Sequence, residues 1–118
     1  MRVRGDLDAI GLALRNLVEN ALVHGVGGSF IRLACAGSRE TVSLAVIDDG
    51  PGISAKELPS LVKRFARGSA AAGSGAGLGL SIVETLARRM GAKLVLNSPP
   101  EGLRSGFEAR LEWREKSR

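Results

Sequence analysis

Two amide side chains four positions apart, Asn16 and Asn20, are the first candidates for chemistry in this chain. Residues at positions i and i+4 of a helix project from the same face, so both amides point the same way. We expect that face to differ from the apolar face of the helix. An amide oxygen is an uncharged ligand, and Mg²⁺ on a triphosphate takes only one or two oxygens from a protein. The pair therefore suits a metal–triphosphate site, and two solvated amides are the alternative interpretation.

A carboxylate that runs into a glycine turn, in the stretch Asp48–Ile53, is the second candidate. Asp48 ends an apolar strand, where a charged group is costly unless it finds hydrogen-bond donors. The exocyclic amine of adenine is such a donor. Gly50 and Gly52 lack side chains, so a flat ring can lie against the backbone there. An ordinary Asp-Gly turn at the end of a strand is the alternative.

Alternating glycines precede a third apolar segment, at Gly73, Gly75, Gly77 and Gly79. A glycine loop at a helix N-terminus presents bare N–H groups and the positive end of the helix dipole, which suit phosphate. The spacing matches neither the dinucleotide pattern G-x-G-x-x-G nor the P-loop pattern G-x-x-x-x-G-K-[ST]. A flexible linker is the alternative, although it would not explain why Leu78 and Leu80 follow immediately.

Two further side chains are candidates by position. Arg67 flanks the glycine-rich loop and is placed to reach a terminal phosphate as that loop closes. His24, the only histidine, suits either a ligand contact or the negative end of a helix dipole.

Three helical segments are predicted to position these groups. Apolar spacings of three and four predict a helix over 6–24, with Asp6 as N-cap. Ser54 and Glu57 have the spacing of a capping box, which predicts a short helix from residue 54. A loop over 66–76 and a helix over 80–90 follow. The predicted buried stripe of the first helix comprises Leu7, Ile10, Leu14, Leu17 and Ala21.

Alternation of apolar and polar residues predicts four strands, at 30–36, 42–48, 93–97 and 107–113. In the last strand Glu108, Arg110 and Glu112 are expected on a wet face. Cys35 is expected to be a small buried apolar residue. Helices on one face of a mostly antiparallel sheet are the economical packing for this order of elements, which predicts an α+β domain.

Composition favours one globular domain and excludes some partners. The chain has 118 residues and a net charge of +5, with basic residues scattered and no Tyr. A nucleic-acid binder would need a clustered basic stripe with aromatic platforms. No apolar run approaches the roughly 18 residues of a membrane-spanning helix. We therefore predict no nucleic-acid partner and no direct membrane contact.

The order of these motifs resembles the ATP-binding domain of bacterial sensor histidine kinases. Residues Asn16–Ala21 resemble the N box, Val46–Ile53 the G1 box, Arg64–Gly68 the F box and Gly75–Val83 the G2 box. The resemblance covers nearly the whole chain. It implies the Bergerat fold, a two-layer α/β sandwich with a mostly antiparallel mixed sheet and helices on one face. Residues 1–118 would be this one domain, with its N-terminal strand truncated.

The resemblance also implies a role for each candidate residue, with ATP and Mg²⁺ as cofactors. Asn20 would be the Mg²⁺ ligand, and Asn16 would support the phosphate side. Relatives that hydrolyse ATP carry Glu at the position of Asn16, and an amide cannot act as that base. Val23 stands where the family usually has Lys or Arg, which shifts the contact with phosphate to Arg67. The implied nucleotide contacts are His24 and Asp48 at adenine, Gly50, Gly52 and Ile53 in the base pocket, and Gly75, Gly77, Leu78 and Gly79 near the phosphates.

The function implied is transfer of the γ-phosphoryl group of ATP to a histidine on a separate dimerisation domain, in the cytoplasm. A response regulator would act downstream. One alternative is a nucleotide-binding regulatory module, such as an anti-sigma serine kinase or a silent homologue, and Asn16 argues against it. Another is a non-enzymatic fragment whose sheet edge is exposed. Such an edge invites pairing between chains, so we expect self-association.

Overall fold

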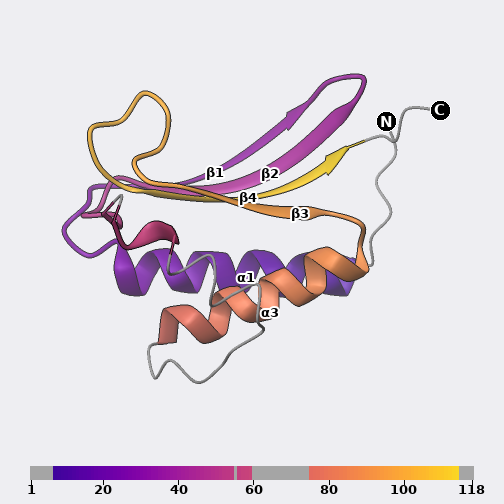
Figure 1. Cartoon of the computed structure of the whole chain (residues 1–118), viewed down its shortest axis with the longest axis horizontal. Coiled ribbons are helices and arrows are strands. Elements are labelled where there is room, and N and C mark those ends of the chain that lie inside the picture. The colour runs from indigo at the N-terminus through magenta and orange to yellow at the C-terminus, as the bar shows by residue number, and fades with distance from the viewer. Residues whose placement is uncertain (1–6, 55, 60–74, 115–118) are drawn as a thin grey trace.

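A sheet and a layer of helices form the two layers of the molecule. The computed structural model describes residues 7–54, 56–59 and 75–114. In chain order the elements are α1 (Leu7–His24), β1 (Ile31–Gly37), β2 (Thr41–Asp48), α3 (Gly75–Arg89), β3 (Lys93–Asn97) and β4 (Phe107–Arg114). The strands lie in the order β1-β2-β4-β3, and every described pairing is antiparallel. Both helices lie against one face of the sheet (Figure 1), which confirms the predicted α+β sandwich.

The core lies between the helices and the two central strands. In the β2–β4 register Val46 is opposite Ala109, and Leu44 is opposite Leu111. Alternate residues of a strand share a face, so this apolar row faces the helices. The largest fully buried side chains are Leu17, Leu80, Val83 and Leu111. The indole N–H of the buried Trp113 donates a hydrogen bond to the carbonyl oxygen of Met90 (3.2 Å), which joins β4 to the end of α3.

The buried face of α1 differs from the predicted one. Leu7 is 87% exposed, whereas Ala13, Leu17, Asn20 and Ala21 are buried. The prediction that Leu7 belongs to the buried stripe is therefore wrong. So is the prediction that both amides avoid the apolar face, because Asn20 shares it. The contact with the sheet and α3 runs along Ala13, Leu17 and Ala21, and Ala9 and Ile10 of the first turn pack against the same core, whereas Leu7 lies outside it.

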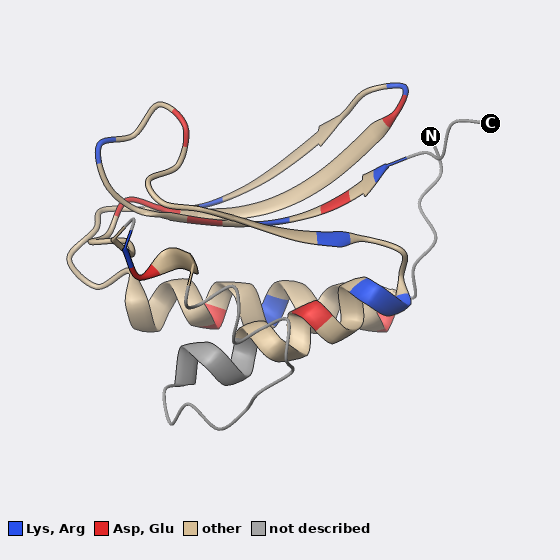
Figure 2. Ribbon diagram, in the orientation of Figure 1, with Lys and Arg blue, Asp and Glu red and all other residues tan. Residues whose placement is uncertain are grey.

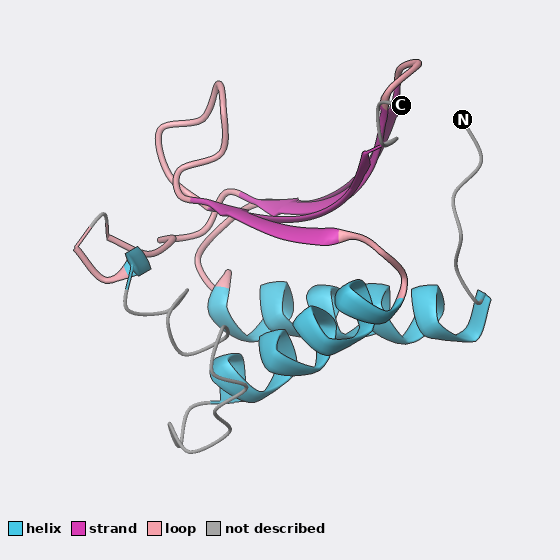
Figure 3. Cartoon of the chain, turned by 45° about the vertical axis from the view of Figure 1, so that its right-hand side comes forward, coloured by secondary structure: helices cyan, strands magenta, loops and turns pink. Residues whose placement is uncertain are grey.

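The β1–β2 hairpin extends beyond the helix layer. Its free end rises away from both helices in two views (Figures 1 and 3). Leu33 and Cys35, on the face that the helices cover elsewhere, are consequently exposed. The prediction of a buried Cys35 is wrong, because strand alternation fixes the face of a residue but not whether a second layer reaches it.

The predicted wet face of β4 is wrong at Glu108, which is only 7% exposed. The neighbouring strands flank it on both sides, because Ile47 and Asn97 are its partners in the register. Asn97 Nδ2 donates a hydrogen bond to Glu108 Oε1 (3.1 Å), and Arg110 Nη1 lies 3.7 Å from Glu108 Oε2. In the described part of the chain, charges of both signs are spread over the sheet and the helices (Figure 2).

Helix α3 begins earlier than predicted. Its first residue is Gly75, so the predicted loop over 66–76 is wrong at its last two residues, and residues 66–74 lie outside the described ones. Glycine is costly in a helix by roughly 0.5–1 kcal/mol relative to Ala but does not prevent one. The first four N–H groups of a helix have no partner within the helix. Among the described residues no helix has the length and apolarity needed to cross a membrane.

Truncation of the fully buried Leu111 tests this core. We expect Leu111→Ala to lower the free energy of unfolding by about 2–5 kcal/mol, because it leaves a cavity between the layers. The matched control is Leu33→Ala on β1, where the side chain is 59% exposed and the expected loss is below about 1 kcal/mol. Urea denaturation followed by circular dichroism measures both. Equal losses would contradict the assignment of the core.

Candidate functional site

A cavity of about 320 Å³ lies between the C-terminal part of α1 and the turn after β2. Four elements or turns contribute to it: α1, the Pro51–Glu57 segment, the start of α3 and the start of β4. Its lining residues are Asn20, His24, Pro51, Gly52, Ile53, Glu57, Leu80 and Phe107. The structure thus brings together four of the predicted site residues, namely Asn20, His24, Gly52 and Ile53.

Asn20, one of the residues that line this cavity, carries a buried acceptor without a partner. The side chain is 9% exposed, and its Oδ1 has no hydrogen-bond partner. A buried polar atom without a partner costs about 1–3 kcal/mol, so the arrangement suits a ligand that approaches this oxygen. The described residues contain no group of three or more His, Cys, Asp or Glu that could hold a metal ion. A cation at Asn20 would therefore share its coordination with water or with the oxygens of a bound ligand.

Asn16 is placed differently from Asn20. Its Nδ2 donates a hydrogen bond to the carbonyl oxygen of Leu12 (2.9 Å), one turn back in the same helix. It is not among the residues that line the cavity.

Asp48 is buried at the end of β2, with 3% of its surface exposed. Burial raises the pKa of this carboxyl group, and the nearby charge of Asp49 adds to the rise. The backbone N–H groups of Gly50 and Phe107 lower its pKa, and the bond from Gly50 to Oδ1 measures 2.8 Å. Asp48 is not itself a lining residue, but its register partner Phe107 is. The carboxyl group and Asn20 therefore lie at the same end of the molecule.

Asp49 ties the loop after α1 to the turn after β2. Its Oδ1 accepts hydrogen bonds from the backbone N–H groups of Ser29 (2.7 Å) and Phe30 (3.0 Å). The hydroxyl group of Ser29 donates to Oδ2. The Ser29 hydroxyl, followed by the Phe30 N–H, lowers the pKa of Asp49 from its ordinary value near 3.8. Sequence reasoning missed this role, because the donors come from residues about 20 positions away.

Glycines let the backbone of the loop after α1 contact the backbone of the turn after β2. A Cβ on Gly50 would lie 2.6 Å from the Cα of Gly25, and one on Gly28 would lie 2.7 Å from the N of Gly50. Gly50 does not line the cavity, so its missing side chain makes room for Gly25. Gly52 does line it and has a φ of 70°, a conformation that favours glycine.

Four lining residues had not been predicted as site residues: Pro51, Glu57, Leu80 and Phe107. Glu57 follows Ser54, whose Oγ accepts a hydrogen bond from the Glu57 N–H (3.1 Å), as the capping-box spacing indicated. The capping-box spacing predicted this turn, but it did not predict that Glu57 lies beside the cavity. The other three are apolar walls, and no chemical signal in the sequence separates them from ordinary core residues.

The remaining predicted residues lie in or near the glycine-rich segment. Gly75, Gly77, Leu78 and Gly79 form the first turns of α3, and the next residue, Leu80, lines the cavity. The N-terminal end of α3 is therefore close to it. Arg67 lies outside the described residues, as does the whole Arg64–Gly68 motif.

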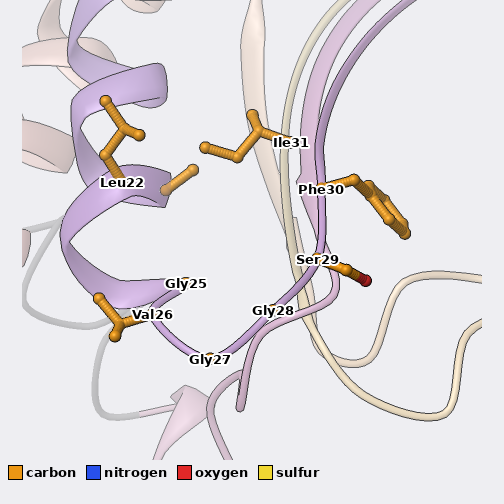
Figure 4. Close-up of a pocket in the computed structure, with 9 residues that line it drawn as sticks. Leu22, Gly25, Val26, Gly27, Gly28, Ser29, Phe30 and Ile31 are labelled. Carbon is orange, nitrogen blue, oxygen red and sulfur yellow. The ribbon is translucent and has the colours of Figure 1, made fainter.

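A second, more open cavity of about 330 Å³ lies between the end of α1 and the start of β1 (Figure 4). Leu22, Val26 and Ile31 give it apolar walls, whereas the Phe30 ring points away from them, and no predicted site residue lines it. Its polar side chain, Ser29, is already bonded to Asp49. The polar ligand predicted from the sequence fits the first cavity better.

Comparisons with known proteins show the family and the fold of the chain. The family described as "Histidine kinase-, DNA gyrase B-, and HSP90-like ATPase" matches residues 5–116. The sensor-type histidine kinase PrrB of Mycobacterium leprae is 41% identical over 91 residues, which cover 77% of this chain and 20% of PrrB. The chain thus spans about a fifth of the length of the curated relatives it matches first.

Two solved histidine kinase structures are similar in fold to this chain. The ATP-binding domain of PrrB from Mycobacterium tuberculosis has a TM-score of 0.63 at 29% identity, over 97% of this chain and 71% of that one. Full-length ShkA in complex with AMPPNP has a TM-score of 0.68 at 26% identity, over 89% of this chain and 21% of that one.

The Asp49 contacts predict a pH-dependent stability. Because the folded state lowers the pKa of Asp49, its stabilising contribution is full above the ordinary pKa and is lost as pH falls through the lowered value. We expect Asp49→Asn to have a lower Tm than the unaltered chain at pH 7, and the gap to narrow below about pH 4. Scanning calorimetry at both pH values measures this gap.

The control is Glu40→Gln in the exposed turn between β1 and β2, which should leave Tm unchanged at both pH values. A Tm difference between Asp49→Asn and the unaltered chain that is the same at pH 7 and at acid pH would contradict the role given to the Asp49 charge.

Proposed function

Because the chain belongs to the family of histidine kinase-, DNA gyrase B- and HSP90-like ATPases, we propose that it is the ATP-binding catalytic domain of a two-component sensor histidine kinase. Residues 1–118 form this single domain. It passes the γ-phosphoryl group of ATP to a histidine on a separate dimerisation domain of the same kinase, and a response regulator acts downstream. The domain works in the cytoplasm and needs neither nucleic acid nor a direct membrane contact.

The observation that carries the proposal is the unpaired Oδ1 of Asn20, a residue that lines the cavity. It fits a Mg²⁺ ion that is shared with the phosphates of ATP, since a neutral oxygen adds no charge repulsion. When bound, Mg²⁺ neutralises charge on the β- and γ-phosphates during transfer. Asn20 holds the phosphate end of the nucleotide in place. The AMPPNP in the related ShkA complex supports a nucleotide in a domain of this fold.

The base end of the nucleotide fits the other side of the cavity. Ile53, Leu80 and Phe107 offer apolar surface to the faces of the adenine ring. Asp48 accepts a hydrogen bond from the exocyclic amine at the ring's edge, and His24 lies beside the ring. Gly50 shapes this pocket indirectly, through its contact with Gly25.

The phosphates extend toward the N-terminal end of α3. Gly75, Gly77, Leu78 and Gly79 form its first turns. The first N–H groups of a helix and the positive end of its dipole suit an anion. Arg67 supplies the positive charge that Val23 cannot. Asn16 supports the phosphate side and cannot take a proton from water, so bound ATP is kept for the histidine of the partner domain.

Titration calorimetry with ATP tests the proposal directly. We expect the unaltered chain to bind ATP on the order of tenfold more tightly with Mg²⁺ than with a chelator, and Asn20→Ala to lose this difference. The control is Asn97→Ala, whose amide bonds to Glu108 and does not line the cavity, and which should keep the magnesium effect. Binding that does not depend on magnesium, or no binding by a folded chain, would refute the proposal.

A transfer assay tests the activity itself. Incubation with labelled ATP and the histidine-bearing dimerisation domain should give an acid-labile phosphohistidine, and Asn20→Ala should abolish it. Steady phosphorylation of a partner's serine would instead favour the regulatory alternative. Self-association through the sheet edges remains part of the proposal, and a clean monomer at high concentration in light scattering would refute that part.

A further inference from the structure

Two apolar walls of the candidate nucleotide cavity come from segments far apart in the chain. Ile53 belongs to the turn after β2, and Phe107 is the first residue of β4. A nucleotide base can contact both walls only if their separation is fixed. The spacing of these two segments is therefore a requirement of the site.

The hydroxyl group of Ser98 joins the two segments. Its Oγ accepts a hydrogen bond from the backbone N–H of Ile53 (2.8 Å) and donates one to the carbonyl oxygen of Gly106 (2.7 Å). Ile53 is a wall residue, and Gly106 directly precedes the wall residue Phe107. Ser98 itself is half-buried and does not line the cavity.

The contact leaves no space for a side chain at Gly52. A Cβ on Gly52 would lie 2.6 Å from Ser98 Oγ and would overlap the carbonyl oxygen of Gly106. The turn and the strand entry are thus packed backbone against backbone around this hydroxyl group. Removal of the hydroxyl group would take this partner from the N–H of Ile53 and from the carbonyl of Gly106, which destabilises the present spacing of the two segments.

We propose that Ser98 is a positioning residue for the nucleotide base, a role that rests on the function proposed above. Its two hydrogen bonds hold Ile53 and Phe107 at the separation that lets both contact the ring. Dispersion attraction falls steeply with distance, and a gap of about 0.5–1 Å forfeits roughly a quarter to a half of it. Ser98 therefore sets the affinity for the base without touching the nucleotide.

Calorimetric titration with ADP tests this role in the unaltered chain and its variants. We expect Ser98→Ala to weaken ADP binding on the order of tenfold and Ser98→Thr, which keeps the hydroxyl group, to stay within about threefold of the unaltered chain. The matched control is Ser105→Ala, because the exposed Ser105 hydroxyl makes only a 3.4 Å contact with the Asp49 carbonyl. It should bind ADP normally. The magnesium effect on ATP should persist in Ser98→Ala, because Asn20 is untouched.

Amide hydrogen exchange gives a readout that does not require nucleotide. The N–H of Ile53 should be protected in the unaltered chain and in Ser98→Thr, and should exchange faster in Ser98→Ala. If Ser98→Ala does not fold, Ser98→Cys in reducing buffer replaces it, since a thiol of similar shape is a weak donor and acceptor.

The outcomes separate the two proposals. Nucleotide binding by a folded Ser98→Ala or Ser98→Cys variant that equals that of the unaltered chain would overturn the role of Ser98 alone. So would unchanged protection of Ile53, or a failure of Ser98→Thr to rescue binding. No binding by the unaltered chain would overturn the nucleotide function itself.

Discussion

The direct contact between the loop after α1 and the turn after β2 is the constraint on which the site depends. Gly25 and Gly50 meet backbone to backbone, and the Asp49 carboxylate holds Ser29 and Phe30 beside them. This contact brings the end of a helix against the end of a strand. Side chains from the two layers, which would otherwise belong to separate surfaces, consequently surround one cavity.

The cavity divides into two ends of different chemistry. Asn20 carries an unpaired oxygen on the helix side, while Ile53 and Phe107 form apolar walls on the other side, and the buried Asp48 is the register partner of Phe107. A molecule with a flat ring at one end and a metal-bound anionic group at the other matches both.

The sequence predicted the elements well because hydrophobic periodicity is local information. All four described strands and both long helices were expected, and their observed boundaries differ from the predicted ones by a few residues. Burial was less predictable: Cys35 is exposed and Glu108 is buried, because burial depends on what a neighbouring layer or strand covers. Asn20, Asp48 and Gly52 stood out because their types are unusual in their segments. Ser98 and Asp49 did not, since their partners lie far away in the chain.

The bond between the Trp113 indole and the Met90 carbonyl has a practical consequence. Trp113 is the single tryptophan of the chain, and the structure buries it where β4 meets the end of α3. Its fluorescence emission therefore reports whether the helix layer remains docked on the sheet, and a red shift would mark separation of the layers. Since Trp113 does not line the cavity, binding of a ligand there should change this fluorescence emission very little.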